Sequence, residues 1–197
     1  MEIVLASGNS GKLLELGALL APVGIQLTSQ SLLGITSVPE TGKTFIENAI
    51  IKARHAATNS GLPAIADDSV LCVNALSGAP GIHSARYAGD SASDEDNNRK
   101  LIMQLHNSED RAARFVCVLV FLKSALDPFP IIATGQWQGR IVDQGQGQNG
   151  FGYDPHFYLD ELNCTSAQLS PPHKNTISHR GQASDELLRH LQAQLAR

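Results

Sequence analysis

An almost uninterrupted apolar run, "FVCVLVFL" from Phe115 to Leu122, constrains the fold of this chain more than any other stretch. Its β-branched and aromatic residues favour a strand, and its lack of polar alternation predicts that both faces of the strand are covered. The run is far shorter than the roughly 20 residues that a membrane-spanning helix needs. It therefore indicates an α/β fold in which helices cover both faces of a sheet, with no segment that spans a membrane.

The clearest helix begins at Thr44, in "TFIENAIIKARHAATNSG". Thr44 and Glu47 have the spacing of a capping box, and Gly61 is typical of a helix end. On the face opposite the apolar stripe, Asn48 and Lys52 are four residues apart and can act together on a ligand, although a solvated helix face explains them equally well. The stripe that we expect to be buried comprises Phe45, Ile46, Ala49, Ile50 and Ala53.

The other elements alternate between strand and helix. "EIVLAS" predicts a strand that leads through a glycine-bearing turn to a helix ended by Pro22, and "PAIADDSVLCVNAL" predicts a strand, an acidic break and a second strand. A helix is expected from about Ser93 to His106, and "FPIIATGQWQGRIV" is expected to form a strand pair or one bent strand. The segments "SGAPGIHSARYAGDSAS" and "DQGQGQNGFGYDPHF" are typical of long loops.

Composition limits the classes of partner. The 197 residues, of which 42% are apolar and 17% charged, are expected to form one folding unit over residues 1–197. A net charge of −4 without a Lys/Arg cluster argues against a nucleic-acid polymer, so any phosphate ligand is expected to be small. Three widely separated cysteines favour neither a disulfide framework nor a zinc site, and the N-terminus does not resemble a secretory signal, so we expect a cytoplasmic protein.

The turn "SGNSGK" is the first candidate site. It is not a P-loop, because Ala6 and Leu13 stand where that motif needs Gly and Ser or Thr. A strand, a glycine-rich turn and a helix N-terminus can nevertheless hold a phosphate with backbone N–H groups. The alternative is an ordinary turn with an exposed lysine. The residues of this turn are Ser7, Gly8, Asn9, Ser10, Gly11 and Lys12.

Adjacent carboxylates, Asp67 and Asp68, form the second candidate site. Adjacent side chains of an extended chain point to opposite faces, so only one of the two is expected to face a cleft. One or two carboxylates with substrate phosphates suit Mg²⁺, and Glu40 offers a second oxygen donor. The alternative is an Asx turn between two strands.

The third candidate site combines "NGFGYDP" with "HKNTISHRG". Glycines beside Phe151 and Tyr153 allow a close approach to a ligand, and an aromatic ring can stack on a base. Lys174, His179 and Arg180 are donors that can read base oxygens. The last helix is expected to open at Asn175 and to carry His179 and Arg180 in its first turn. The helix dipole disfavours cations there, and an anion bound from outside is the simplest explanation.

Six stretches, "SGNSGK", "ETGKTFIENAIIKA", "IADDS", "GAPGIHSARYAG", "NGFGYDP" and "KNTISHRGQA", together resemble the inosine triphosphate pyrophosphatase family, also called the dITP/XTP pyrophosphatases. The resemblance covers nearly the whole chain. It implies an elongated, two-lobed single α/β domain around a central mixed β-sheet flanked by helices, with the active-site cleft between the lobes, and a homodimer. It also implies hydrolysis, with Mg²⁺, of ITP, dITP and XTP to the nucleoside monophosphate and pyrophosphate, which keeps deaminated purines out of DNA and RNA.

The resemblance also assigns residues. It implies that Glu40 and Asp68 hold the metal and that Asp68 is the general base. The substrate-binding residues that it implies are Ser7, Gly8, Asn9, Ser10, Gly11, Lys12 and Lys52 for the triphosphate, Ser69 for a further substrate contact, Phe151, Gly152, Tyr153 and Asp154 for the sugar and base, and Lys174, His179 and Arg180 for the purine. Departures from the common bacterial pattern, none of which removes a proposed catalytic group, occur at Val70, Asn74, His83 and Pro171-Pro172-His173.

Two other interpretations remain open from the sequence. A Maf-like nucleotide pyrophosphatase of different base preference has a related reaction, but that group typically has Ser-Pro-Arg-Arg where this chain has Asn9-Ser10-Gly11-Lys12. A nonenzymatic nucleotide-binding module is the second, and it would need no general base.

Overall fold

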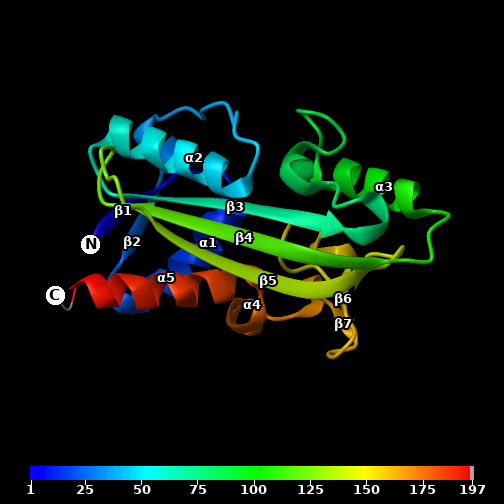
Figure 1. Ribbon diagram of the computed structural model, residues 1–197. Coiled ribbons are helices and arrows are strands. Elements are labelled where there is room, and N and C mark those ends of the chain that lie inside the picture. The colour runs from blue at the N-terminus through cyan, green and yellow to red at the C-terminus, as the bar shows by residue number, and fades with distance from the viewer. Residues whose placement is uncertain (196–197) are drawn as a thin grey trace. The chain divides into compact units, whose positions relative to one another are not determined.

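Seven strands form one sheet in the order β2-β1-β3-β4-β5-β6-β7 in the computed structural model, which describes residues 1–195 (Figure 1). β1 pairs in parallel with β2 and β3, whereas β6 pairs antiparallel with β5 and β7, so the sheet is mixed. The strands are β1 Glu2–Leu5, β2 Gln26–Ser29, β3 Ala64–Val73, β4 Ala112–Leu122, β5 Ile131–Ile141, β6 Phe157–Leu159 and β7 Cys164–Thr165. The α/β fold with a mixed sheet is therefore confirmed.

Five α-helices accompany the sheet in residues 1–195. None of these helices has both the length and the apolar composition needed to cross a bilayer. The helices are α1 Ser10–Leu20, α2 Phe45–Ser60, α3 Asp94–Leu105, α4 Pro171–Ile177 and α5 His179–Leu195. Residues 196–197 of the predicted folding unit lie outside the described part of the chain.

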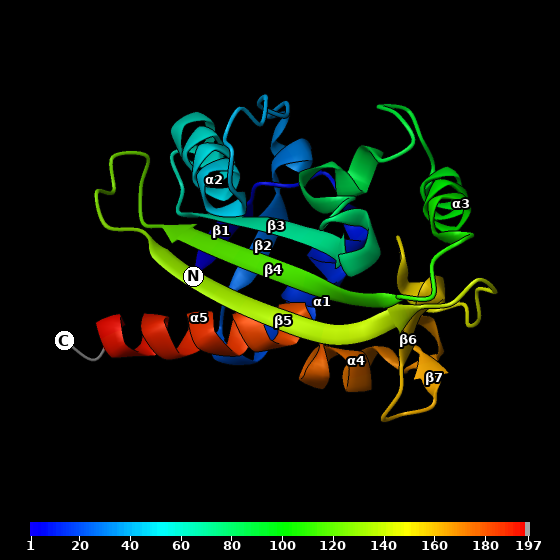
Figure 2. The ribbon, with the colours of Figure 1, turned by 45° about the vertical axis from the view of Figure 1, so that its right-hand side comes forward.

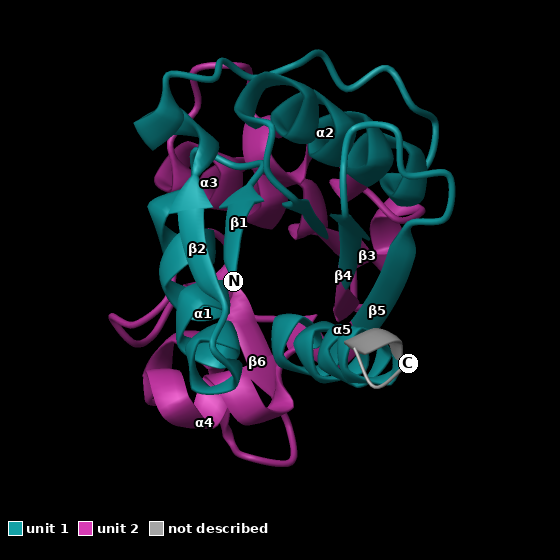
Figure 3. Cartoon of the chain, turned by 90° about the vertical axis from the view of Figure 1, so that its left-hand side faces the viewer, with its two compact units in different colours: residues 1–69, 117–135, 179–197 teal, residues 70–116, 136–178 magenta. Residues whose placement is uncertain are grey.

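The chain divides into two compact units (Figure 3). Unit 1 comprises Met1–Ser69, Cys117–Gly135 and the chain from His179 onward. Unit 2 comprises Val70–Val116 and Gln136–Ser178. The chain passes between the units within β3, β4 and β5, and each unit has its own hydrophobic core.

Unit 1 has two cores because successive residues of a strand point to opposite faces of the sheet. Ile3 and Leu5 of β1 lie in a core with α1 and α5, whereas Val4 lies in a second core with α2. Figures 1 and 2 show α2 and α5 on opposite faces of these strands. On β4, Leu119 belongs to the first core and Val120 to the second, which confirms that both faces of the strand are covered.

Gly135 on β5 allows α5 to begin directly against the sheet. A Cβ atom at this position would lie 2.0 Å from the carbonyl oxygen of His179 and 2.8 Å from the backbone nitrogen of Ala183. Any larger residue would displace this backbone. The glycine therefore fixes the place of the first turn of α5, which carries His179 and Arg180 as predicted.

The core of unit 2 is centred on Phe157 of β6. Its ring centroid lies 4.5 Å from that of Phe115 and 5.5 Å from that of Trp137. Leu101 and Leu105 of α3 pack into the same core, and Ser93 begins that helix with a capping box, so the predicted helix is confirmed.

α2 forms as predicted, with one exception. A capping box at Thr44 begins the helix, and Gly61 ends it with a φ of 70°, a left-handed value that favours glycine. Ala49 and Ala53 are buried, but Ile46 is 39% exposed, so its predicted place in the buried stripe is wrong.

Two other predicted boundaries are wrong. β3 continues through Asp67 and Asp68 without an acidic break, because cations from other elements neutralise both carboxylates. "FPIIATGQWQGRIV" contains one strand, β5, which is the second of the two alternatives predicted for it. The last predicted helix is preceded by a separate one, since α4 ends at Ile177 and α5 begins at His179.

Candidate active site

Two neighbouring carboxylates on β3 face different surroundings within unit 1. The Asp67 side chain is 0% exposed, whereas that of Asp68 is 11% exposed. This difference follows from the alternation of side chains along a strand, and it stays a prediction that Asp68 is the carboxylate that faces a cleft.

Two cations neutralise the buried carboxylate of Asp67. Lys12 Nζ, from α1, donates to Oδ1 at 2.7 Å, and Arg180 Nε, from α5, donates to Oδ2 at 2.6 Å. The hydroxyl of Ser69 also donates to Oδ1, at 2.6 Å. Burial acts to raise the pKa of Asp67, but the charges of Arg180 and Lys12 outweigh it and hold that pKa well below its ordinary value. Asp67 is therefore a charged carboxylate near neutral pH.

Arg180 has its counter-ions within the chain. The residue is 2% exposed, and its guanidinium donates to Glu15 of α1 and to the Ser69 hydroxyl in addition to Asp67. Burial acts to lower the pKa of Arg180, but Asp67 and Glu15 outweigh it and raise that pKa. The expectation that an external anion balances Arg180 is therefore wrong. The adjacent His179 is also buried, at 3% exposure.

Cys117 lies in the same buried region. Its Sγ is 3.8 Å from Asp67 Oδ2, and burial, with the negative charge of Asp67, raises the pKa of the thiol to about 12. A thiol with that pKa is protonated at neutral pH and is a poor nucleophile. Cys117 is therefore a structural residue.

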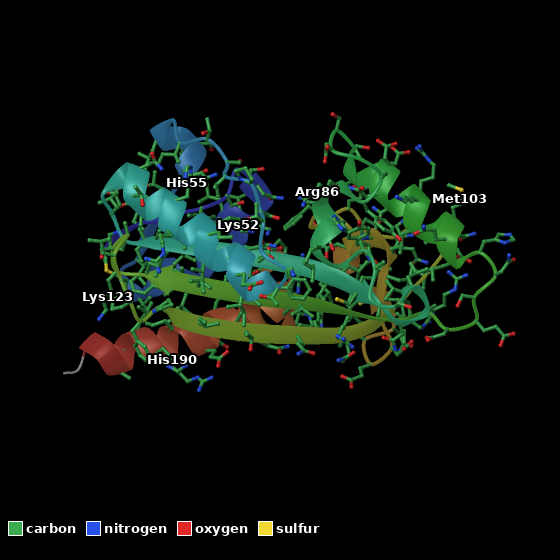
Figure 4. The ribbon with its side chains drawn as sticks, turned by 45° about the horizontal axis from the view of Figure 1, so that its top comes forward. Lys52, His55, Arg86, Met103, Lys123 and His190 are labelled. Atoms are coloured by element: carbon green, nitrogen blue, oxygen red, sulfur yellow. The ribbon has the colours of Figure 1, made fainter. Side chains whose placement is uncertain are left out.

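Lys52 on α2 lies between two carboxylates; Figure 4 labels this lysine. Its Nζ donates to Asp68 Oδ1 at 2.7 Å and lies 3.1 Å from Glu40 Oε1. Burial acts to lower the pKa of Lys52, but Asp68 and then Glu40 outweigh it, so that pKa is raised. The ammonium group thus brings together the two carboxylates that we expected to hold a metal.

The ammonium groups of Lys12 and Lys52 converge although different helices carry them. Lys12 Nζ donates to the carbonyl oxygen of Asp67 at 3.2 Å, and Lys52 Nζ donates to the same oxygen at 3.3 Å. Carboxylates of the chain balance both charges, so the two ammonium groups form a pair of oriented hydrogen-bond donors, the kind of group that phosphate oxygens accept from.

Side chains of the turn itself shape the segment before α1. Ser7 Oγ accepts from the backbone N–H of Asn9 at 3.1 Å, and Asn9 Oδ1 caps α1 by accepting from the N–H of Lys12 at 3.1 Å. A Cβ atom at Gly8 would meet no atom within 4 Å, so the space above this glycine is open. The turn is preformed and exposed over residues 8–10.

We expected Asn48 on the face of α2 opposite the apolar stripe. The residue is instead buried, with 1% of its surface exposed. Its Oδ1 accepts from the N–H of Gly42 at 2.8 Å, which ties the segment after Glu40 to the helix. A Cβ atom at Gly42 would lie only 2.6 Å from that of Glu47. Asn48 and Gly42 therefore position the segment that carries Glu40.

In unit 2, Asp154 organises the predicted base-binding residues. Its Oδ2 accepts from Lys174 Nζ at 2.6 Å and from the N–H of Phe151 at 2.9 Å, while Oδ1 accepts from the Ser166 hydroxyl at 2.7 Å. Lys174 Nζ also lies 5.3 Å from the centroid of the Phe151 ring, within the range of a cation–π interaction. One buried carboxylate thus fixes a cation and an aromatic segment beside each other.

Tyr153 has a structural role. It is 5% exposed, packs in the core of unit 2 and donates its hydroxyl to the carbonyl oxygen of Ser84 at 2.8 Å. Burial raises the pKa of this phenol. Of the two aromatic residues, Phe151 is the one that is partly exposed, and it stays a prediction that an aromatic ring of this segment stacks on a base.

The carboxylates fit a metal that also binds the substrate. Within residues 1–195, no group of three or more His, Cys, Asp or Glu side chains is arranged to hold a metal ion by itself. Mg²⁺ is commonly held by one or two carboxylates together with phosphates and water. Glu40 and Asp68 are carboxylates of the kind that this mode needs, and both lie beside Lys52 Nζ; that they hold a metal stays a prediction.

The predicted site residues fall into two groups. The structure brings cations and carboxylates together within each unit, and it remains a prediction that the two groups share one cavity. Unit 1 carries Ser7, Gly8, Asn9, Ser10, Gly11, Lys12, Glu40, Lys52, Asp68, Ser69, His179 and Arg180, and unit 2 carries Phe151, Gly152, Tyr153, Asp154 and Lys174.

Sequence reasoning missed Glu15 and gave Asp67 no role. Glu15 follows Lys12 by three residues, a spacing that places both on one face of α1 and that could have indicated a shared partner. Asp67 has no such local signal, because its partners come from α1 and α5.

The fold and the groups of charged side chains around Asp67 and around Asp154 define an α/β protein with a candidate anion-binding site. The sequence model of the Ham1 family matches residues 3–190. The chain belongs to the Ham1 family.

Relatives and solved structures match over nearly the full length. A dITP/XTP pyrophosphatase of Nitrosomonas europaea is 54% identical over 96% of this chain and 94% of its own length. Another, from Vibrio parahaemolyticus, is 53% identical over 99% of this chain and 98% of its own length. The structure of a HAM1 protein from Coxiella burnetii superposes with a TM-score of 0.89 at 48% identity and covers 98% of this chain and 99% of that chain.

Asp67→Asn is expected to lower the free energy of unfolding by roughly 3–5 kcal/mol at pH 7, because a neutral amide removes the buried counter-ion of Lys12 and leaves Arg180 with Glu15 alone. Urea denaturation measures this loss. Asp160→Asn, which breaks an exposed ion pair with Arg140, is the control and is expected to cost less than about 1 kcal/mol.

The pH dependence of stability provides a second measurement on the same variant. The pKa of Asp67 is lowered in the folded state. The stability that its charge contributes is therefore fully present above about pH 3.9, the pKa of an aspartate in the unfolded chain, and is lost as the pH falls through the pKa of Asp67 in the folded protein. Wild type is therefore expected to lose more stability than Asp67→Asn on acidification below about pH 4. Equal losses in the two proteins would contradict this role of Asp67.

Proposed function

We propose that this chain hydrolyses ITP, dITP and XTP to the nucleoside monophosphate and pyrophosphate, which keeps deaminated purines out of DNA and RNA. The observation that carries the proposal is the convergence of Lys12 and Lys52 on the carbonyl oxygen of Asp67, beside the Asp68 carboxylate. The names of relatives that are 54% and 55% identical, dITP/XTP pyrophosphatases, support it. The family match does not support the Maf-like alternative.

Neutralisation of charge is the first task of the site. A triphosphate brings about four negative charges, which oppose the approach of a nucleophile to the α-phosphorus. Lys12 and Lys52 present two ammonium donors at one point for the phosphate oxygens, and the raised pKa of Lys52 keeps its ammonium group protonated. The turn from Ser7 to Lys12 contributes its backbone at the start of α1.

Asp68 is the proposed general base. It accepts a proton from the attacking water while the water oxygen bonds to the α-phosphorus, the α–β phosphoanhydride bond breaks and pyrophosphate leaves. Proton transfer of this kind is typically worth ~10²–10⁴-fold in rate. The hydrogen bond from Lys52 orients the Asp68 carboxylate. Mg²⁺, held by Asp68 and Glu40, would supply further positive charge to the phosphates.

Base selectivity is proposed to depend on hydrogen-bond donors near Phe151. Hypoxanthine and xanthine carry an oxygen at C6, where adenine carries an amino group. Lys174, fixed by Asp154 beside the Phe151 ring, and His179 are the proposed donors to that oxygen. Arg180 acts through Asp67 instead, because its guanidinium is bonded to Asp67 and Glu15.

The resemblance further supports a homodimer that acts in the cytoplasm on a small nucleotide, without a nucleic-acid polymer or a membrane as partner. These assignments are part of the proposal.

Product analysis tests the reaction. With ITP and Mg²⁺, wild type is expected to release pyrophosphate and IMP, and removal of Mg²⁺ with a chelator is expected to stop turnover. Asp68→Asn is expected to stay folded and to lose at least ~10²-fold in kcat, because it lacks the general base. Release of phosphate and IDP, binding of ITP without pyrophosphate release, or near-normal turnover by Asp68→Asn would overturn the mechanism.

A comparison of kcat/KM for ITP, XTP and ATP tests the selectivity. A site whose donors bond the C6 oxygen can reject an analogue that lacks it by ~10⁴-fold. We therefore expect kcat/KM for ITP and for XTP to exceed that for ATP by a large factor. Equal values for the three substrates would exclude recognition of the C6 oxygen.

A further inference from the structure

We infer that Asn98 on α3 is a positioning residue for the base subsite, where it fixes Gly152 together with Asp94 and thereby places the neighbouring Phe151 ring. The inference rests on the proposed function, since it names the helix that orders one wall of the same site. All of these residues belong to unit 2.

α3 holds both backbone polar groups of Gly152. The N–H of Gly152 donates to Asp94 Oδ2 at 2.7 Å, and Asn98 Nδ2 donates to the carbonyl oxygen of Gly152 at 2.9 Å. Asp94 and Asn98 are four residues apart, so they lie on one face of the helix, one turn apart. The helix therefore binds one peptide segment at two points, which fixes its orientation as well as its position.

Gly152 itself contributes no side-chain packing to the segment. Its φ is +63°, and a Cβ atom there would meet no atom within 4 Å. A cavity of about 830 Å³ lies beside it, lined by Asp94 and Asn98 on the α3 side and by Phe151 and Gly152 on the loop side. On this side of the loop the two bonds to α3 hold Gly152, while Tyr153 anchors the next residue in the core.

The amide of Asn98 is buried for this contact. Asn98 is 7% exposed, and within residues 1–195 its Oδ1 has no hydrogen-bond partner while its Nδ2 bonds Gly152. Burying an amide with an unpaired acceptor is unfavourable, so the single bond to Gly152 offsets only part of its cost. Asn98 is therefore better explained by where it places Gly152 than by its contribution to stability.

The placement of Gly152 reaches the ring through the adjacent residue. Asp154 holds the N–H of Phe151 at 2.9 Å, and Lys174 lies 5.3 Å from the ring centroid. The segment is thus fixed by Asp154 at Phe151 and by α3 at Gly152. Loss of the α3 contacts would free one side of the segment and weaken base binding, while Lys12 and Lys52 in unit 1 would keep their contacts with phosphate.

Asn97 provides a matched control. It precedes Asn98 on α3, is 3% exposed, accepts through Oδ1 from the N–H of Ala88 at 2.8 Å, and donates through Nδ2 to the carbonyl oxygen of Ala85 at 3.4 Å. Asn97→Asp keeps the acceptor and replaces a donor that does not reach Gly152, whereas Asn98→Asp replaces the donor to Gly152 with an oxygen. Both changes add the same charge to neighbouring positions of one helix. Asp94→Ala, at an exposed position, removes the other contact with Gly152 and is the second variant, in case Asn98→Asp does not fold.

The experiment is titration calorimetry of IMP and of pyrophosphate with wild type and the three variants, after thermal unfolding has established that each is folded. Asn98→Asp and Asp94→Ala are each expected to weaken IMP binding about tenfold, as the loss of one hydrogen bond predicts. Pyrophosphate binding is expected to stay within about twofold of wild type, and Asn97→Asp is expected to bind both ligands normally.

Three results would overturn the inference: unchanged IMP binding in both variants, an equal loss for pyrophosphate, or an equal loss in Asn97→Asp. Wild-type turnover of ITP separates this inference from the proposed function. If wild type hydrolyses ITP while Asn98→Asp and Asp94→Ala bind IMP normally, the positioning role fails and the function stands. If wild type neither hydrolyses ITP nor binds IMP, the proposed function fails, and the inference fails with it.

Discussion

The buried Asp67 carboxylate is the constraint on which the rest of unit 1 depends. It neutralises Lys12 from α1 and Arg180 from α5, and its own backbone carbonyl receives Lys52 from α2. A buried ion pair of this kind is weak evidence for stability, because desolvation opposes the attraction. Its clearer effect is geometric, since three helices must present their cations to one residue of β3. The lysine pair is a consequence of that arrangement.

Unit 2 uses the same physical device. Asp154 is a buried carboxylate that accepts from Lys174 and from the backbone of Phe151, so one residue sets the place of a cation and an aromatic ring. In both units the cation that we assign to the substrate is held by an acid of the chain itself. Such pairing orients a lysine before a ligand binds, which lowers the cost of ordering the site.

Local patterns in the sequence predicted much of this structure, and tertiary contacts explain what they missed. The capping box at Thr44 and the apolar run of β4 depend on neighbouring residues, so both were predictable. The acidic break in β3 was not, because the cations that neutralise Asp67 are distant in the chain. The counter-ions of Arg180, Asp67 and Glu15, are also distant in the chain, and for that reason the sequence suggested that an external anion balances this residue. α4 had a local signal that we overlooked, a Ser cap followed by Pro171.

Tripolyphosphate binding to Lys12→Met, Lys52→Met and the double variant tests most directly whether the two lysines form one polyphosphate site. Each single substitution is expected to weaken binding by at least about tenfold, and the two effects are expected to be non-additive by roughly 0.5–3 kcal/mol, because both ammonium groups bind the same ligand. Calorimetry at fixed ionic strength provides the dissociation constants. Tripolyphosphate affinity that is unchanged in either single variant would contradict a shared site.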